Sequence, residues 1–131
     1  MKKIIKTDKA PLPIGAYSQA VIHNGTLYIS GQIAINPATG ELVQGEIEDE
    51  TKQVMENLKA ILAEAGLSFG NVVKCSVFVK DMNDFGRING VYGQYFDEAT
   101  APARELVEVV NLPRFVNVEI SNCKILESSI S

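Results

Sequence analysis

Apolar residues in the middle of the chain recur with the spacing of an amphipathic helix. Within residues 47–65 they lie three, four or seven positions apart, which places them on one side of a helix. The apolar positions are Ile47, Val54, Met55, Leu58, Ile61, Leu62 and Ala65. Gly66 is a suitable stop, so we predict one helix over 47–65. The acidic residues of 41–50 precede it and are interpreted as a solvated run that complements the helix dipole.

The chain beyond Gly66 predicts a second helix and three strands. Residues 84–96 predict a helix, although three glycines lower its propensity, and its apolar side would hold Phe85, Ile88, Tyr92 and Phe96. The β-branched content of residues 72–80 predicts a strand, and two more are predicted at 103–110 and 116–126. This order of elements favours a single α+β domain over residues 1–131, with two helices packed on one face of a mixed β-sheet.

The sequence Asn24-Gly25 lies between two strand-like runs and predicts a β-hairpin. With a two-residue loop, one face of the hairpin becomes apolar and suits a covering of helices; it holds Ala20, Ile22, Leu27 and Ile29. The opposite face gathers hydroxyl and amide groups from Tyr17, Gln19, Val21, Tyr28, Ser30 and Gln32. That face predicts a hydrated cleft or a subunit contact, with a half-exposed sheet as the alternative. A one-residue shift of register would exchange the two faces.

Arg104 and Glu119 occupy alternating positions of the two late strands. We take Val107 to face the helices, so that Arg104 points the other way. Ile120 is taken to face the helices as well, so Glu119 would share a face with Arg104. The same alternation turns Glu105 toward the apolar face, where an unpaired charge is costly. An arginine and a glutamate on one sheet face form either a structural salt bridge or a catalytic pair.

The composition argues against several classes of function. Twelve Lys and Arg residues against 16 Asp and Glu residues give a net charge of −4, which disfavours a nucleic-acid partner. Neither a signal-peptide h-region nor a membrane-spanning stretch is evident, so we expect a cytoplasmic protein with no membrane partner. Cys75 and Cys123 are expected to be reduced core thiols. Metal-ligand clusters and phosphate-binding loops are not evident, so neither a metal nor a cofactor is expected.

Five short motifs, taken together, resemble the RidA (YjgF) family. They are Ile14-Gly15-Ala16-Tyr17-Ser18-Gln19-Ala20, Ile29-Ser30-Gly31-Gln32, Val77-Phe78-Val79-Lys80-Asp81, Pro102-Ala103-Arg104, and Leu112-Pro113 followed by Val118-Glu119-Ile120. Each motif is weak alone, but all five occur in the family's order across essentially the whole chain. The resemblance implies an α+β fold similar to chorismate mutase, assembled as a homotrimer with clefts between adjacent subunits.

The resemblance also implies hydrolysis of 2-imino acids to 2-keto acids and ammonia, which protects pyridoxal-phosphate enzymes from reactive imines. By matching motif, Arg104 would bind the substrate carboxylate, and Glu119 would position or activate water. The planar guanidinium suits a carboxylate, and a protonated imine is electrophilic enough to need neither a metal nor a covalent nucleophile. The other implied site residues are Gly31 and Leu106, through their backbone N–H groups, and Tyr17 and Ser30, through their side chains.

Three residues depart from the family pattern. Ala16 stands where proline is usual, Leu106 where cysteine is frequent, and Glu105 where a small or apolar residue follows the arginine. Three outcomes are open for Glu105: it lies in water at a strand end, it pairs with a cation, or its charge near Arg104 weakens carboxylate binding or shifts the substrate preference. This departure keeps open a non-catalytic trimer that binds small carboxylates or acts as a chaperone. An endoribonuclease that inhibits translation is a further alternative, which the negative charge and the single histidine, His23, disfavour.

Overall fold

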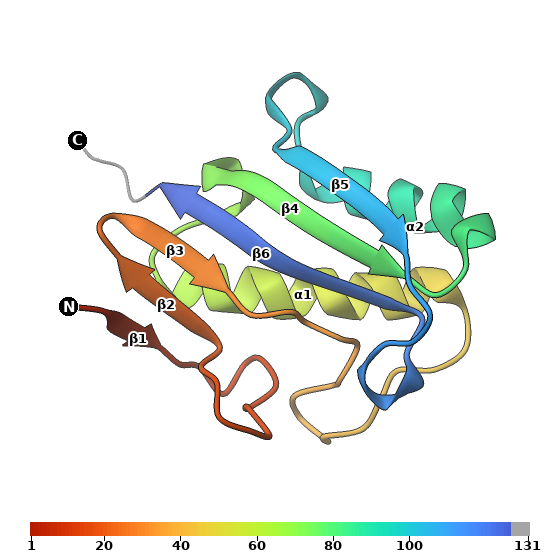
Figure 1. Ribbon diagram of the computed structural model, residues 1–131, viewed down its shortest axis with the longest axis horizontal. Coiled ribbons are helices and arrows are strands. Elements are labelled where there is room, and N and C mark those ends of the chain that lie inside the picture. Colours follow the sequence, from red (N-terminus) through yellow and green to blue (C-terminus); the bar gives the residue numbers. More distant parts are fainter. Residues whose placement is uncertain (127–131) are drawn as a thin grey trace.

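One six-stranded sheet organises the computed structural model, which describes residues 1–126 and the side chains of residues 1–121 (Figure 1). The strands are β1 (Lys3–Ile5), β2 (Ala20–His23), β3 (Thr26–Ile29), β4 (Val72–Val79), β5 (Ala103–Glu108) and β6 (Val118–Leu126). Their spatial order is β1-β2-β3-β6-β4-β5. Only the β4–β5 pair is parallel among these neighbours, so the mixed sheet is confirmed.

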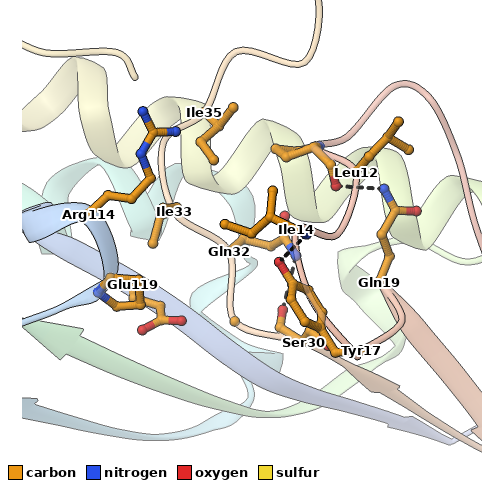
Figure 2. A pocket seen from close by; sticks show the side chains of 13 residues that line it. Leu12, Ile14, Tyr17, Gln19, Ser30, Gln32, Ile33, Ile35, Arg114 and Glu119 are labelled. Atoms are coloured by element: carbon orange, nitrogen blue, oxygen red, sulfur yellow. Dashed lines mark hydrogen bonds between the residues drawn. The ribbon is translucent and has the colours of Figure 1, made fainter. Parts of the chain in front are cut away.

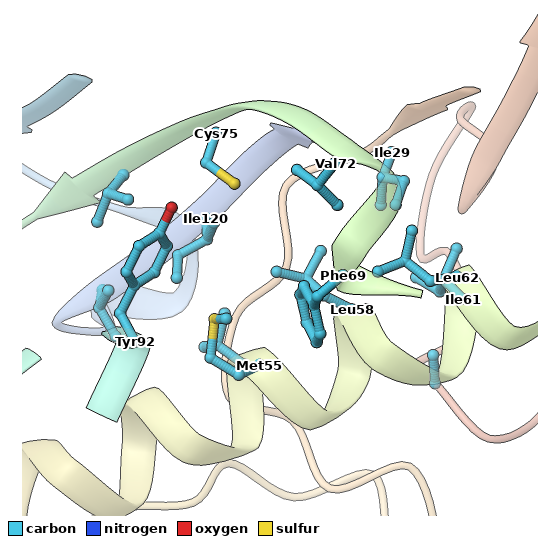
Figure 3. Close-up of a cluster of buried hydrophobic side chains, with 14 of the residues drawn as sticks. Ile29, Met55, Leu58, Ile61, Leu62, Phe69, Val72, Cys75, Tyr92 and Ile120 are labelled. Atoms are coloured by element: carbon cyan, nitrogen blue, oxygen red, sulfur yellow. The ribbon is translucent and has the colours of Figure 1, made fainter. Parts of the chain in front are cut away.

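The two helices, α1 (Ile47–Glu64) and α2 (Phe85–Tyr92), lie on one face of the sheet (Figure 1). α1 matches the prediction to within one residue, because its apolar stripe packs on the sheet. The buried members of that stripe are Ile47, Val54, Met55, Leu58, Ile61 and Leu62. Figure 3 shows the last four of them in the core. Within residues 1–126, no helix is both long and apolar enough to cross a membrane.

α2 is shorter than predicted, since it ends at Tyr92 and a 3₁₀ turn, Gly93–Tyr95, follows. Ile88 and Tyr92 are buried as expected. Phe85, which the prediction places with them on the apolar side of the helix, is 40% exposed. It is the first residue of the helix, and its ring lies 5.8 Å from the Arg104 guanidinium carbon.

The β2–β3 hairpin has the predicted register. Ala20 pairs with Ile29 and Ile22 with Leu27 across the Asn24-Gly25 turn. Both turn residues have positive φ, 52° and 75°, which is the conformation that an Asn-Gly hairpin turn requires. The apolar face is buried against the helices, and the opposite face carries the groups described below.

The predicted orientation of β5 is wrong. Arg104 pairs with buried Cys75, and Leu106 pairs with buried Val77 and packs against the core. Both side chains therefore lie on the helix side, whereas Glu105 faces the opposite side beside Ser76. β5 is an edge strand whose two sets of alternate residues are each part apolar and part charged, so alternation alone does not orient it.

Cys75 is buried in the core, as predicted (Figure 3). The side chain of Cys123 lies outside the described residues.

Candidate functional site

A cavity of about 370 Å³ opens where the loops at residues 11–17, 30–35 and 113–114 meet the start of β6 (Figure 2). It lies on the sheet face opposite the helices, and its wall is mostly apolar. Four of the six predicted site residues line it: Tyr17, Ser30, Gly31 and Glu119. The other two, Arg104 and Leu106, do not.

Glu119 packs directly against the main chain of Gly31. A β-carbon built on Gly31 would lie 2.1 Å from Glu119 Oε2, so no other residue fits there without moving the carboxylate. Two backbone hydrogen bonds fix this approach: Gln32 N–H donates to Ile120 O (2.8 Å), and Ile120 N–H donates to Gln32 O (3.2 Å). Burial raises the pKa of Glu119 above its usual 4.5. A carboxylate of this kind can accept a proton closer to neutral pH than an exposed one.

Glu50 of α1 holds the main chain just before β6 through two hydrogen bonds from Asn117. Its two carboxylate oxygens accept hydrogen bonds from the backbone N–H (2.8 Å) and the side-chain amide (2.9 Å) of Asn117. Glu50 is only 3% exposed, so the interpretation of the acidic run as solvated is wrong at this residue. The contact holds the main chain two residues before Glu119.

Tyr17 and Ser30 both line the cavity (Figure 2). The pairing of Ser30 with Gln19 continues the predicted hairpin register, whereas Tyr17 lies in the loop before β2 and the predicted partner Gln32 pairs with Ile120 instead. Ser30 Oγ donates to Ser18 O (2.6 Å), and its backbone N–H donates to Gln19 O (2.9 Å). Tyr17 Oη accepts a hydrogen bond from the Ile14 N–H (3.3 Å). The hydroxyl groups are thereby held by the main chain beside the cavity.

Arg104 lies on the other side of the sheet, in a second cavity of about 540 Å³. Its Nη1 donates to Asn89 Oδ1 (2.7 Å), and its guanidinium carbon lies 4.9 Å from the centre of the Tyr92 ring. Both partners belong to α2. The prediction that Arg104 and Glu119 share a face of the sheet within one chain is therefore wrong, because β5 has the opposite orientation from the one assumed.

Glu105 forms an ion pair with Lys74 and a hydrogen bond with Ser76, so its charge is not left unpaired in an apolar environment. One carboxylate oxygen lies 2.8 Å from Lys74 Nζ, and the other accepts a hydrogen bond from Ser76 Oγ (2.5 Å). The contact with Lys74 contributes most to lowering the pKa of Glu105, and the hydrogen bond from Ser76 lowers it further. The side chain faces away from Arg104, so the expectation that its charge lies on the apolar face is wrong.

Arg114 is a cavity residue that the sequence analysis did not identify. It lines the same cavity as Glu119, and its backbone is left-handed, with φ of 56°. The next residue, Phe115, is also left-handed, with φ of 58°, and its side chain is 79% exposed. Left-handed backbone is uncommon for such residues and collects at functional sites. The position of Arg114 directly after the motif proline Pro113 is the sequence signal that could have singled it out.

The described residues include no group of three or more His, Cys, Asp or Glu side chains arranged to hold a metal ion. The residues that line the main cavity include one half-buried carboxylate, Glu119, the hydroxyl groups of Tyr17 and Ser30, and one cation, Arg114.

The sequence of this small α+β domain matches one known protein family over most of its length. The family model described as Endoribonuclease L-PSP matches residues 7–124, and the chain belongs to this family, which is also called RidA or YjgF.

Named relatives and solved structures are similar along nearly the whole chain. A RutC family protein of Synechocystis is 54% identical, over 95% of this chain and 96% of its own. The mouse 2-iminobutanoate/2-iminopropanoate deaminase is 49% identical, over 92% and 88%. A crystal structure from Thermotoga maritima matches with a TM-score of 0.93 and 50% identity, over 98% and 100%. Escherichia coli TdcF with bound serine matches with a TM-score of 0.89 and 44% identity, over 96% and 99%.

Proposed function

We propose that the protein is a cytoplasmic 2-iminoacid deaminase that hydrolyses reactive 2-imino acids to 2-keto acids and ammonia. The observation that carries the proposal is the half-buried Glu119 carboxylate, held in a cavity against Gly31 with Tyr17 and Ser30 beside it. Relatives at about half identity that are named as imine deaminases support it. So does the serine bound to TdcF, because an amino acid resembles the proposed substrate in size and charge.

In the proposed mechanism, Glu119 orients a water molecule and accepts one of its protons as the water oxygen attacks the carbon of the protonated imine. The carboxyl group then returns the proton to the nitrogen. As the carbon–nitrogen bond breaks and ammonia leaves, the Glu119 carboxylate accepts the proton of the hydroxyl group, so that the keto group forms. The carboxyl group finally releases this proton to the ammonia or to solvent. Such acid–base assistance typically contributes about 10²–10⁴-fold in rate. The raised pKa of Glu119 suits both steps, since the group must take up and release a proton near neutral pH.

Arg104 is proposed to bind the substrate carboxylate, and this role requires a second subunit. Within one chain Arg104 lies on the helix side of the sheet and Glu119 on the opposite side, so one small acid cannot contact both. A homotrimer with clefts between adjacent subunits would bring Arg104 of one chain to Glu119 of the next. Gly31 and Leu106 are proposed to contribute backbone N–H groups in the same cleft.

Two other functions are distinguishable by experiment. A non-catalytic trimer would bind small 2-keto acids without accelerating imine hydrolysis. An endoribonuclease, the activity for which the family model is named, would cleave RNA. The net charge of −4 and the position of the only histidine, exposed at the hairpin turn, give that activity little support.

The proposal is tested by generating imines with a pyridoxal-phosphate dehydratase or an L-amino-acid oxidase and trapping them with semicarbazide. The protein should reduce the trapped adduct, and Arg104→Ala should abolish that reduction while leaving the assembly intact. Arg87→Ala is a matched control, because Arg87 pairs with Glu46 and Glu48 at the surface and lines neither cavity. Unchanged adduct with the wild-type protein would contradict the proposal, and RNA cleavage instead would favour the endoribonuclease.

A further inference from the structure

The Glu119 carboxylate is not held in place by hydrogen bonds of its own. Within residues 1–121, no group donates to it, and no hydrogen bond joins it to the other residues drawn in Figure 2. Gly31 limits its position on one side by contact alone. The position of the carboxylate therefore follows from the path of the main chain at residue 119, and it depends on the contacts that fix this path on either side.

The main chain before Glu119 is fixed at Asn117. The Asn117 carbonyl group accepts a hydrogen bond from the Lys80 N–H (3.0 Å). The Asn117 N–H donates to Glu50 Oε2 (2.8 Å), and its side-chain Nδ2 donates to Glu50 Oε1 (2.9 Å). Three polar groups of this one residue are thus bonded, and two of them are bonded to the same carboxylate.

Glu50 is a charged group of the interior that the proposed mechanism does not otherwise use. It lies in the first turn of α1 and is only 3% exposed. A buried carboxylate is costly unless it is paired or hydrogen-bonded, and within residues 1–121 no basic side chain pairs with it. The two hydrogen bonds from Asn117 compensate its burial. Because hydrogen bonds to an ionised group are roughly twice as strong as neutral ones, they hold Asn117 firmly.

The two side chains are complementary in one arrangement. Asn117 presents two donors, and an ionised carboxylate offers acceptors and no donor. Glu50→Gln would direct an NH₂ group against a donor, and Asn117→Asp would direct a carboxylate against a carboxylate. When both changes are made, the new amide oxygen can accept from the backbone N–H of residue 117. The new amide nitrogen can donate to the new carboxylate, so both hydrogen bonds return.

We infer that Glu50 is a positioning residue for Glu119, which acts from the helix layer through the main chain of Asn117. It contacts neither the cavity nor the substrate. The inference rests on the proposed function, in which Glu119 orients the attacking water. A misplacement of a catalytic group by about 1 Å can cost about 10²-fold in rate, so a contact two residues away from that group controls turnover.

The test is a double-mutant cycle of Glu50→Gln and Asn117→Asp in the semicarbazide trapping assay. Each single variant should lower kcat by roughly 10- to 100-fold, the upper end being the cost of about 1 Å of misplacement. KM should not change, because neither residue binds the substrate. The double variant should recover most of the lost kcat. Values of kcat are compared per mole of folded protein, which urea unfolding measures, so that lost stability does not imitate lost positioning.

Glu56→Gln is the matched control. Glu56 lies on the same helix, accepts a hydrogen bond from Tyr95 Oη (2.7 Å) and lines neither cavity, so its variant should keep the wild-type kcat. Asn117 is exposed, so Asn117→Asp should fold even where loss of the buried charge unfolds Glu50→Gln. Wild-type kcat in a folded single variant, or a double variant no more active than Asn117→Asp, would overturn the inference while leaving the proposed function in place.

A wild-type protein that hydrolyses no imine would instead defeat the proposed function, and the position of Glu119 would then be followed by NMR. The carboxyl signal of Glu119 is assigned by its absence in Glu119→Gln, and its pKa in the wild type lies above 4.5 because the group is buried. Each single variant should bring this pKa closer to 4.5 as the carboxylate moves toward water, and the double variant should restore it. The same raised pKa in all variants would overturn the inference by itself.

Discussion

The main chain of Gly31 and the carboxylate of Glu119 pack against each other with no room for a side chain between them. Gly31 lies two residues after the end of β3 and Glu119 lies at the start of β6; the Gln32–Ile120 bridge brings the two segments together. Glycine at position 31 therefore allows the Glu119 carboxylate to lie directly against the main chain, and the position of the carboxylate depends on this glycine.

Gly31→Ala should displace Glu119 and reduce kcat for imine hydrolysis by about 10²-fold or more, the low end of what acid–base assistance contributes. The reason is steric, since the new methyl group would occupy the space of Oε2. Steady-state kinetics measures the effect, and circular dichroism confirms that the variant folds. Gly86→Ala is the control, because a β-carbon there meets open space. Wild-type kcat in Gly31→Ala would show that the position of Glu119 is unimportant.

Glu119 should impose a pH dependence on stability. Burial raises its pKa in the folded protein above the value of about 4.5 in the unfolded chain. Its contribution to stability is therefore fully present below pH 4.5 and is lost as the pH rises through the folded-state pKa. Glu119→Gln removes this loss, so the variant should gain stability relative to the wild type as the pH increases toward neutrality. Urea unfolding at several pH values measures it; a constant difference across the range would contradict the prediction.

The raised pKa of Glu119 should also determine the pH below which the activity falls. Glu119 acts as a base only when it is ionised, so kcat should fall with decreasing pH around a pKa above 4.5. Measurement of kcat across the pH range in the trapping assay locates this limb. An acidic limb at or below 4.5 would mean that Glu119 is not the base whose titration controls turnover.

Two inactive variants should restore activity when they are mixed. If each site takes Arg104 from one subunit and Glu119 from the next, co-refolded Arg104→Ala and Glu119→Gln chains in equal amounts should regain about one quarter of wild-type activity, because that fraction of clefts in a random cyclic assembly has both groups intact. Refolding each variant alone is the control and should give none. No recovery in an assembly shown to be mixed would mean that a site does not combine these two residues from different chains.

Glu105→Gln should leave kcat/KM unchanged, because Glu105 faces away from Arg104 and is engaged by Lys74 and Ser76. Its pKa is lowered by these contacts, so its contribution to stability is present at neutral pH and is lost as the pH falls through the folded-state pKa. The variant should therefore be slightly less stable than the wild type at neutral pH and low salt, and equal to it in acid. A clear rise in kcat/KM would show instead that this charge inhibits substrate binding.

Sequence patterns predicted correctly those elements that are determined by residues close together in the chain. The apolar stripe of α1 can be read from the helical spacing of its residues alone. The β2–β3 register follows from the two-residue Asn24-Gly25 turn, which has the positive φ values of such a hairpin and thereby sets which residues pair. The orientation of β5 was predicted wrongly because it is set by pairing with β4 at the edge of the sheet, and neither set of alternate residues is purely apolar.

The site was predictable only in part for a related reason. The motifs placed Tyr17, Ser30, Gly31 and Glu119, which the structure brings into one cavity. Arg114 was missed because it enters the cavity from a left-handed turn, which no periodic pattern indicates. The apolar cavity residues of segments 11–14 and 33–35 were missed because Gln19 and Asn57, which are distant in sequence or lie on another element, hold those loops. The spacing of apolar residues along the sequence does not indicate such contacts.

The separation of Arg104 from Glu119 by the thickness of the sheet has a consequence for the concentration at which the protein works. Under the proposed function, a newly synthesised chain carries both groups but is inert until it meets its neighbours. Specific activity should therefore decline on dilution below the dissociation constant of the assembly and recover on concentration. The amount of protein in the cell would then determine how much active enzyme there is and also what fraction of the chains is active.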